Sequence, residues 1–134
     1  MTKSQFIEIV RKELGLEDPA FAELATEAVL QTLHDRLTEG QADHIETHLP
    51  KELKPLWSRG LTDRLLAMWR GPEKMTKREF LRRVGRRAHL SDESRSHDLA
   101  QGVFKALKKQ LPAKDADNVG GQLPRDLKDL WKAA

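Results

Sequence analysis

Residues 49–57 read Leu-Pro-Lys-Glu-Leu-Lys-Pro-Leu-Trp, and residues 123–131 read Leu-Pro-Arg-Asp-Leu-Lys-Asp-Leu-Trp. In both stretches the leucines and the tryptophan recur at steps of three and four, which places them on one stripe of a helix that begins after the proline. A large aromatic side chain fills a protein core more often than it binds a partner. We therefore expect Leu53, Leu56 and Trp57 to close the core of their own part of the chain. Docking into a groove of a partner protein is the alternative.

The spacing of 74 residues between these stretches holds for the rest of the chain. It aligns residues 1–60 with residues 75–134 without a gap and gives 18 identities. The first-copy members outside the quoted stretch are Met1, Thr2, Lys3, Phe6, Val10, Leu16, Asp18, Val29, Leu33, Leu37, Ala42 and Asp43. Such self-similarity indicates an internal duplication, which sets the architecture. The sequence predicts a first helical repeat at 1–60, a connector with a helical segment at 61–74 and a second helical repeat at 75–134.

Apolar residues in each copy recur every three or four positions, as Phe6, Val10 and Leu14 do, which is typical of amphipathic helices. No stretch shows the strict alternation of a half-buried strand. Capping residues and prolines supply the boundaries. The sequence predicts helices at about 3–14, 19–37, 39–48 and 51–58, and again at these positions plus 74. Gly120 and Gly121 predict that the third helix of the second copy is shorter or frayed.

These elements define the expected fold. It is all-α, with two tandem four-helix repeats packed as one pseudo-symmetric helical bundle, because a duplicated unit on a short tether buries the same apolar face of each copy, as two-fold dimers do. Residues 61–69 of the connector are too apolar for a solvated linker. We expect a helical segment there to dock on the bundle and to end at the turn signal of Gly71-Pro72.

The composition excludes several classes of protein. The 134 residues contain no cysteine, which removes disulfides, thiolate metal sites and cysteine nucleophiles. No apolar stretch reaches the roughly 20 residues that span a bilayer, and residues 1–5 lack signal-peptide character. We expect a cytoplasmic protein that contacts no membrane. The net charge of +3 hides an imbalance, because residues 1–60 hold 7 basic and 11 acidic residues, whereas residues 61–134 hold 17 and 10.

The basic excess of the second copy is concentrated in one predicted helix. If the apolar residues of 77–88 face inward, arginines at steps of four face outward. The candidate residues for binding a nucleic acid or an acidic partner are Lys77, Arg78, Arg82, Arg83, Arg86 and Arg87. Guanidinium groups on a helix suit phosphate oxygens, and such contacts weaken with salt. The alternatives are a solvated face and a face attracted to the acidic first copy.

No constellation of residues points to a catalyst or a cofactor. His44 and His48 lie four residues apart, the spacing at which two imidazoles can share a metal ion. The sequence offers no third ligand, and Glu46 is not where a His-Glu-x-x-His motif needs it. No nucleophile elbow, phosphate-binding loop or dinucleotide fingerprint is present. We therefore expect no metal, no cofactor and no enzymatic activity.

Several repeated pieces carry a resemblance to a known family. They are Phe-x-x-x-Val at 6–10 and 80–84, the aliphatic runs 29–37 and 103–111, and His48-Leu49-Pro50 with Gln122-Leu123-Pro124. In these pieces, over both copies, the chain resembles the bacterial family catalogued as domain of unknown function 2267 (DUF2267). The resemblance implies a small all-helical bacterial protein of two halves, with no assigned activity, cofactor or catalytic residue. The arginine-rich helix and the connector sequence Leu65-Leu66-Ala67-Met68-Trp69 depart from the family's usual pattern.

The sequence favours a non-enzymatic protein-interaction or scaffolding module with an unidentified protein partner. A binder of nucleic acid without sequence preference, acting through the arginine-rich helix, is the alternative. A metal or small-ligand site between the two copies is a third hypothesis, which requires a pocket at their junction. The sequence leaves open whether two copies of the chain form a homodimer.

Overall fold

The structure is a computed structural model that describes residues 2–57, 69, 71 and 74–134, and every regular element within these residues is helical. The elements are α1 (Lys3–Leu14), α2 (Pro19–Arg36), α3 (Glu39–His48), the 3-10 turn η1 (Lys51–Leu53), α4 (Lys54–Trp57), α6 (Lys77–Arg87), α7 (Glu93–Gln110), α8 (Ala113–Gln122) and α9 (Arg125–Ala133). The predicted all-α class is confirmed. The bounds agree closely with the predicted ones, although the expected helix at 51–58 begins as a 3-10 turn. No helix in this described part is long and apolar enough to cross a bilayer.

The helix boundaries fall where local hydrogen bonds satisfy the free backbone groups of helix ends. Complete capping boxes form at the start of α1, between Thr2 and Gln5, and at the start of α3, between Thr38 and Gln41. At the end of α1, Gly15 adopts a left-handed conformation with φ 64° and its amide bonds back to the helix. Glycine adopts this conformation without steric cost, so α1 ends there.

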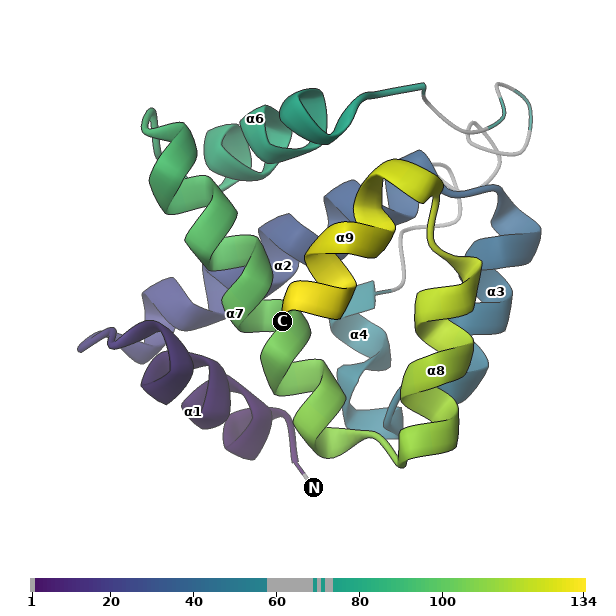
Figure 1. Ribbon diagram of the computed structural model, residues 1–134. Coiled ribbons are helices and arrows are strands. Elements are labelled where there is room, and N and C mark those ends of the chain that lie inside the picture. Colours follow the sequence, from purple (N-terminus) through teal and green to yellow (C-terminus); the bar gives the residue numbers. More distant parts are fainter. Residues whose placement is uncertain (1, 58–68, 70, 72–73) are drawn as a thin grey trace.

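We call residues 1–60 the first half and residues 75–134 the second half. The first helix of each half packs on the second helix of the other, since α1 lies against α7 and α6 lies against α2 (Figure 1). The third helices, α3 and α8, lie side by side. The last helices, α4 and α9, pack on the second helix of their own half. Such reciprocal packing is what a pseudo-symmetric bundle produces, and the symmetry itself stays a prediction.

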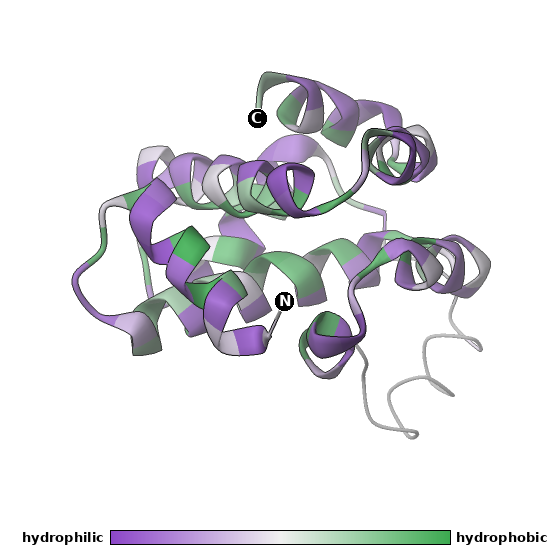
Figure 2. Cartoon of the chain, turned by 90° about the horizontal axis from the view of Figure 1, so that it is seen from below, coloured by the Kyte–Doolittle hydropathy of each residue, from purple (hydrophilic) through white to green (hydrophobic). Residues whose placement is uncertain are grey.

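One continuous core joins the two halves. Buried apolar side chains come from each of the helices named above, and Figure 2 shows hydrophobic segments where the helices face each other. Leu53, Leu56 and Trp57 are buried, as are the matching Leu127, Leu130 and Trp131. The prediction that the two quoted stretches close the core is therefore confirmed. Their apolar residues are not available for a partner's groove.

Residues 34 and 108, which the offset of 74 matches, hold the last helix of their own halves by different chemistry. The buried His34 ring stacks on Trp57 at 4.8 Å, and its Nδ1 lies 3.0 Å from the Trp57 carbonyl oxygen, to which it donates. Lys108 Nζ donates to the carbonyl oxygen of Trp131 at 3.0 Å and lies 5.8 Å from the centre of its ring. An imidazole and an ammonium thus satisfy matching backbone carbonyl groups, one near the end of α4 and one near the end of α9.

The predicted shortening of α8 is wrong, because α8 has 10 residues, as does its counterpart α3. Gly120 lowers intrinsic helix propensity but is needed for packing. A Cβ atom at this position would lie 2.7 Å from two atoms of the Trp131 ring. The absence of a side chain lets the tryptophan pack directly on the α8 backbone, and this tertiary contact outweighs the local cost.

The expected docking of residues 61–69 falls largely outside the described residues. Within that range only Trp69 is described, and its side chain is 88% exposed. Trp69 itself therefore does not dock on the bundle.

Replacement of Trp57 by alanine should lower the melting temperature by about 10 to 15 °C, because loss of a buried aromatic side chain costs about 3 to 5 kcal/mol. Thermal denaturation followed by circular dichroism measures this. Trp69→Ala is the matched control and should leave the melting temperature unchanged. Equal shifts for the two variants would contradict a core role for Trp57.

The two adjacent glycines of α8 should respond in opposite directions to alanine. Gly120→Ala places a methyl group against the Trp131 ring and should destabilise the fold by about 1 to 3 kcal/mol. Gly121→Ala meets nothing within 4 Å and should stabilise it by up to about 1 kcal/mol through helix propensity. Urea unfolding measures both free energies. A stabilising Gly120→Ala would show that Trp131 does not depend on this glycine.

Candidate binding surface on helix α6

Helix α6 buries one side and exposes the other. Thr76 caps its start by accepting a hydrogen bond from the Glu79 amide. Phe80, Leu81 and Val84 are buried and fix the rotation of the helix. The predicted row of arginines is therefore confirmed as a surface feature, because Arg78, Arg82 and Arg86 are all exposed.

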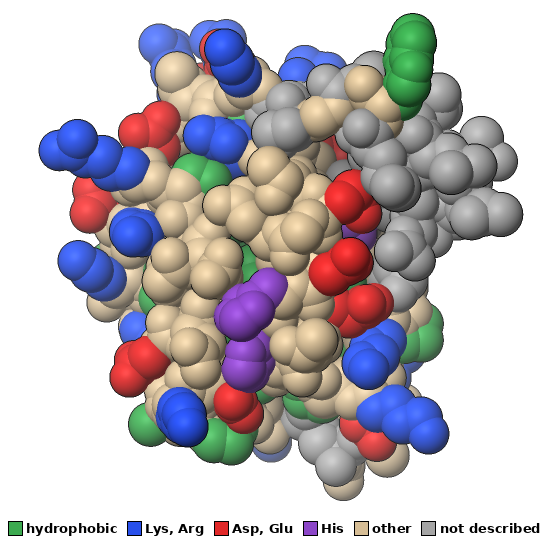
Figure 3. All heavy atoms as spheres, turned by 90° about the vertical axis from the view of Figure 1, so that its right-hand side faces the viewer, with side chains coloured by type: hydrophobic (Ala, Val, Ile, Leu, Met, Phe, Trp, Pro, Cys, Tyr) green, Lys and Arg blue, Asp and Glu red, His purple; other side chains and the backbone are tan. Residues whose placement is uncertain are grey.

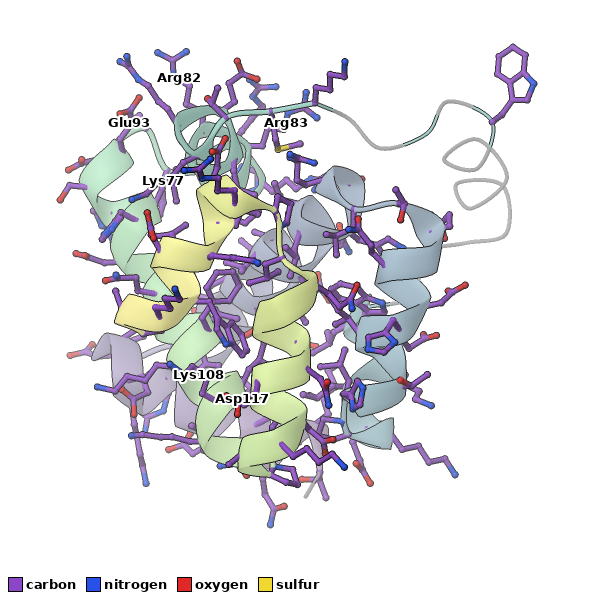
Figure 4. All side chains as sticks on the ribbon, turned by 45° about the vertical axis from the view of Figure 1, so that its right-hand side comes forward. Lys77, Arg82, Arg83, Glu93, Lys108 and Asp117 are labelled. Carbon is purple, nitrogen blue, oxygen red and sulfur yellow. The ribbon has the colours of Figure 1, made fainter. Side chains whose placement is uncertain are left out.

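The arginine row already holds a carboxylate that the sequence pattern does not reveal. Arg78 Nε and Arg82 Nε donate to the same Glu93 Oε1, at 3.3 and 3.2 Å. The two arginine side chains remain 70% and 55% exposed. Figure 4 shows Arg82 and Glu93 at the same end of the molecule, reaching from α6 and from the start of α7. The sequence does contain one indication of this contact. Glu93 follows the Asp92 cap of α7, and the short loop at 88–92 returns the chain beside α6.

The other candidate residues divide between the flanks of this surface and the junction of the two halves. Lys77 and Arg83 are half-buried at its flanks. Arg87 turns toward the first half, where it donates to Thr32 Oγ1 at 2.9 Å and to Asp35 Oδ2 at 2.6 Å. Arg87 is thus part of the contact between the halves, as the alternative of attraction to the acidic first copy expects. The six candidates do not form a single free face.

The two histidines of α3 lie together on the molecular surface. Their rings are 5.0 Å apart, and His48 Nδ1 lies 2.9 Å from Asp115 Oδ1 of α8. Figure 3 shows histidine side chains gathered at the centre of the face formed by α3 and α8. Among the described residues, no three or more histidine, cysteine, aspartate or glutamate side chains are grouped so that they could hold a metal ion.

A hollow does exist where the two halves meet. It has a volume of about 360 Å³ and is lined by α1, α7 and the end of α9, with Glu13, Leu14, Gly102 and Lys105 among its residues. Charged side chains that pair with each other occupy its wall, since Lys105 Nζ lies 3.5 Å from Glu13 Oε2. The hypothesis of a ligand between the halves stays a hypothesis.

The hydrogen bonds from Arg82 and then Arg78 hold the pKa of the Glu93 carboxyl below its usual range. A group with a lowered folded-state pKa contributes its stabilisation above the unfolded-state pKa, and the contribution is lost as the pH falls through the folded-state value. Arg82→Gln should therefore raise the pKa of Glu93, which NMR titration of its side chain can measure. Lys12→Gln, an exposed change on α1, should leave it in place. An unmoved Glu93 pKa in Arg82→Gln would contradict the pairing.

Comparison with known proteins places the chain in a family. The family model described as "Uncharacterized conserved protein (DUF2267)" matches residues 3–130, which include both halves and nearly the whole chain. No curated protein matches the chain. The match covers the same repeated pieces that carry the resemblance in the sequence, and the chain belongs to the DUF2267 family.

Proposed function

We propose that the protein is a non-enzymatic protein-interaction module that binds an acidic segment of a partner protein. The proposed contact is the α6 cationic surface, which we define as Lys77, Arg78, Arg82, Arg83 and Arg86. Arg87 is left out because it bonds to Asp35 of the first half. We further propose that the protein acts in the bacterial cytoplasm, which a chain of 134 residues without cysteine fits.

The observation that carries this proposal is the shared carboxylate of Glu93. Two neighbouring arginines converge on one acidic side chain at the surface and are still largely exposed. Guanidinium groups present several donors in a fixed plane, so the same arginines can donate hydrogen bonds to further carboxylates of a partner. The Glu93 pair serves as an internal example of the contact that an acidic segment would make.

The mixture of charges on this surface favours a protein over a nucleic acid. Glu79 and Glu93 are exposed among the arginines. A phosphate backbone carries negative charge at every residue and is repelled by such carboxylates, whereas a protein partner can match both signs. Helix α6 also spans only 11 residues, or roughly 16 Å. This length is short for a surface that follows the phosphates of a nucleic acid.

A second feature supports a protein partner. Trp69 exposes 88% of its surface, and tryptophan and arginine are the residues enriched at the energetic centres of protein interfaces. The assignment as non-enzymatic rests on the sequence, which offers no nucleophile, metal-ligand or phosphate-loop constellation.

The test compares three baits in a pull-down from native lysate of the source organism, with quantitative mass spectrometry. The baits are the full wild-type chain, R78Q/R82Q/R86Q and the control K12Q/K51Q/K54Q, which removes the same charge from exposed lysines of the first half. We expect the arginine variant to recover a wild-type partner about tenfold less, and the control to recover it normally, because several charge-assisted contacts are lost. Higher salt should weaken recovery by the wild type.

The same experiment decides between the partner classes. Partners that survive nuclease treatment and depend on the arginines support the proposal. Partners lost on nuclease treatment identify a nucleic acid as the ligand and favour the alternative. Equal recovery by the wild type and the arginine variant, with both folded, would place the interaction elsewhere on the molecule.

A further inference from the structure

Two pairs of positions at the junction of the halves carry reversed charges. The offset of 74 matches residue 13 with residue 87 and residue 35 with residue 109. The first half has Glu13 and Asp35 at these positions, and the second half has Arg87 and Lys109. The acids therefore lie in one half and the bases in the other.

The structure pairs each acid with a base across the junction. Glu13 of α1 bonds to Lys109 of α7, and Arg87 of α6 bonds to Asp35 of α2 at 2.6 Å. Both pairs thus join the first helix of one half to the second helix of the other, at matching positions. The two carboxylates are the more buried members, with Glu13 15% and Asp35 11% exposed. The hydrogen bond from Lys109 holds the pKa of Glu13 below its usual range, so this carboxylate stays charged at neutral pH.

Side-chain size shows a matching asymmetry at the same junction. Gly102 of α7 lies against Leu14 of α1 so closely that a Cβ atom at residue 102 would clash with the leucine. The positions that match these two are residues 28 and 88, and both are buried alanines. A large residue facing a glycine in one place is therefore matched by two small residues in the other.

We propose that the two halves are paired about an approximate two-fold axis and that these reversed charges make their pairing strictly heterotypic. Two first halves would bring Glu13 against Asp35 and Leu14 against Ala28. Two second halves would bring Arg87 against Lys109. Like charges placed opposite each other in an interface reject the wrong partner. The α1–α2 face is then complementary to the α6–α7 face of the same chain and to no copy of itself.

The test imposes the charges of homotypic pairing on the full chain. E13R/D35K gives both halves the basic residues of the second half, and R87E/K109D gives both halves the acidic residues of the first. Each double variant should melt about 5 to 10 °C below the wild type, because two attractive pairs become repulsive. The quadruple variant with all four changes exchanges the charges of both pairs and should recover at least half of the loss, as a double-mutant cycle for coupled residues requires. Recovery stays incomplete because Lys105, which also pairs with Glu13, is unchanged.

The control E17K/E52K makes the same change in net charge as E13R/D35K, at exposed glutamates that are not members of these pairs. It should melt within about 2 °C of the wild type, as surface changes usually do. The proposal is overturned if E13R/D35K has the same melting temperature as this control. It is also overturned if the melting temperature of the quadruple variant is no higher than those of the double variants. If a double variant fails to fold, the quadruple variant alone decides. Folding of the quadruple variant supports the proposal, and its failure to fold contradicts the proposal.

Discussion

The structure depends on the packing of each half's first helix against the second helix of the other half. Helix α1 rests on α7 and α6 rests on α2, so neither half can bury the apolar faces of its helices alone. A unit of about 60 residues buries too little surface to be more than marginally stable by itself. The continuous core, with Phe6 and Phe80 both fully buried, is therefore a property of the pair. The hairpins α1–α2 and α6–α7 serve as the two faces of one interface inside a single chain.

This dependence gives the uneven charge of the chain a physical cause. Two halves that must pair with each other gain from opposite charges at their junction, and the ion pairs of Glu13 and Asp35 lie there. The junction accounts for only part of the basic excess. Arg78, Arg82 and Arg86 are exposed, and two of them pair with Glu93 of their own half. These basic residues of the second half thus form two separate sets, one at the junction of the halves and one on the outer surface of α6.

Local signals in the sequence predicted the helices well, because caps and apolar periodicity act within a few residues. The burial of Trp57 and Trp131 followed from the same spacing. The length of α8 was not predictable in this way, since the use of Gly120 depends on a tryptophan that comes from another helix. The partners of Arg82 and Arg87 were missed for the same reason, because their carboxylates lie 11 and 52 residues away in the chain. His34 and Lys108 are unlike residues at matching positions, yet they donate to the matching carbonyl groups of Trp57 and Trp131. Alignment of the two halves by residue identity does not reveal such a shared role.

A duplicated chain can differ between its halves, which a symmetric dimer of one unit cannot. In such a dimer, any substitution appears twice, so an arginine row on the first helix would form two equal binding surfaces. Here Ser4, Glu8 and Lys12 stand where the second half has Arg78, Arg82 and Arg86. Of the two matching helices, only α6 therefore carries the cationic surface, while α1 keeps a mixed charge. The heterotypic pairing proposed for the halves places the α1–α2 hairpin beside this surface. A partner that binds the surface would therefore always meet the same neighbouring hairpin. On the proposals made above, divergence of the predicted repeats places the binding surface on the second half, which suits a complex of one partner per chain.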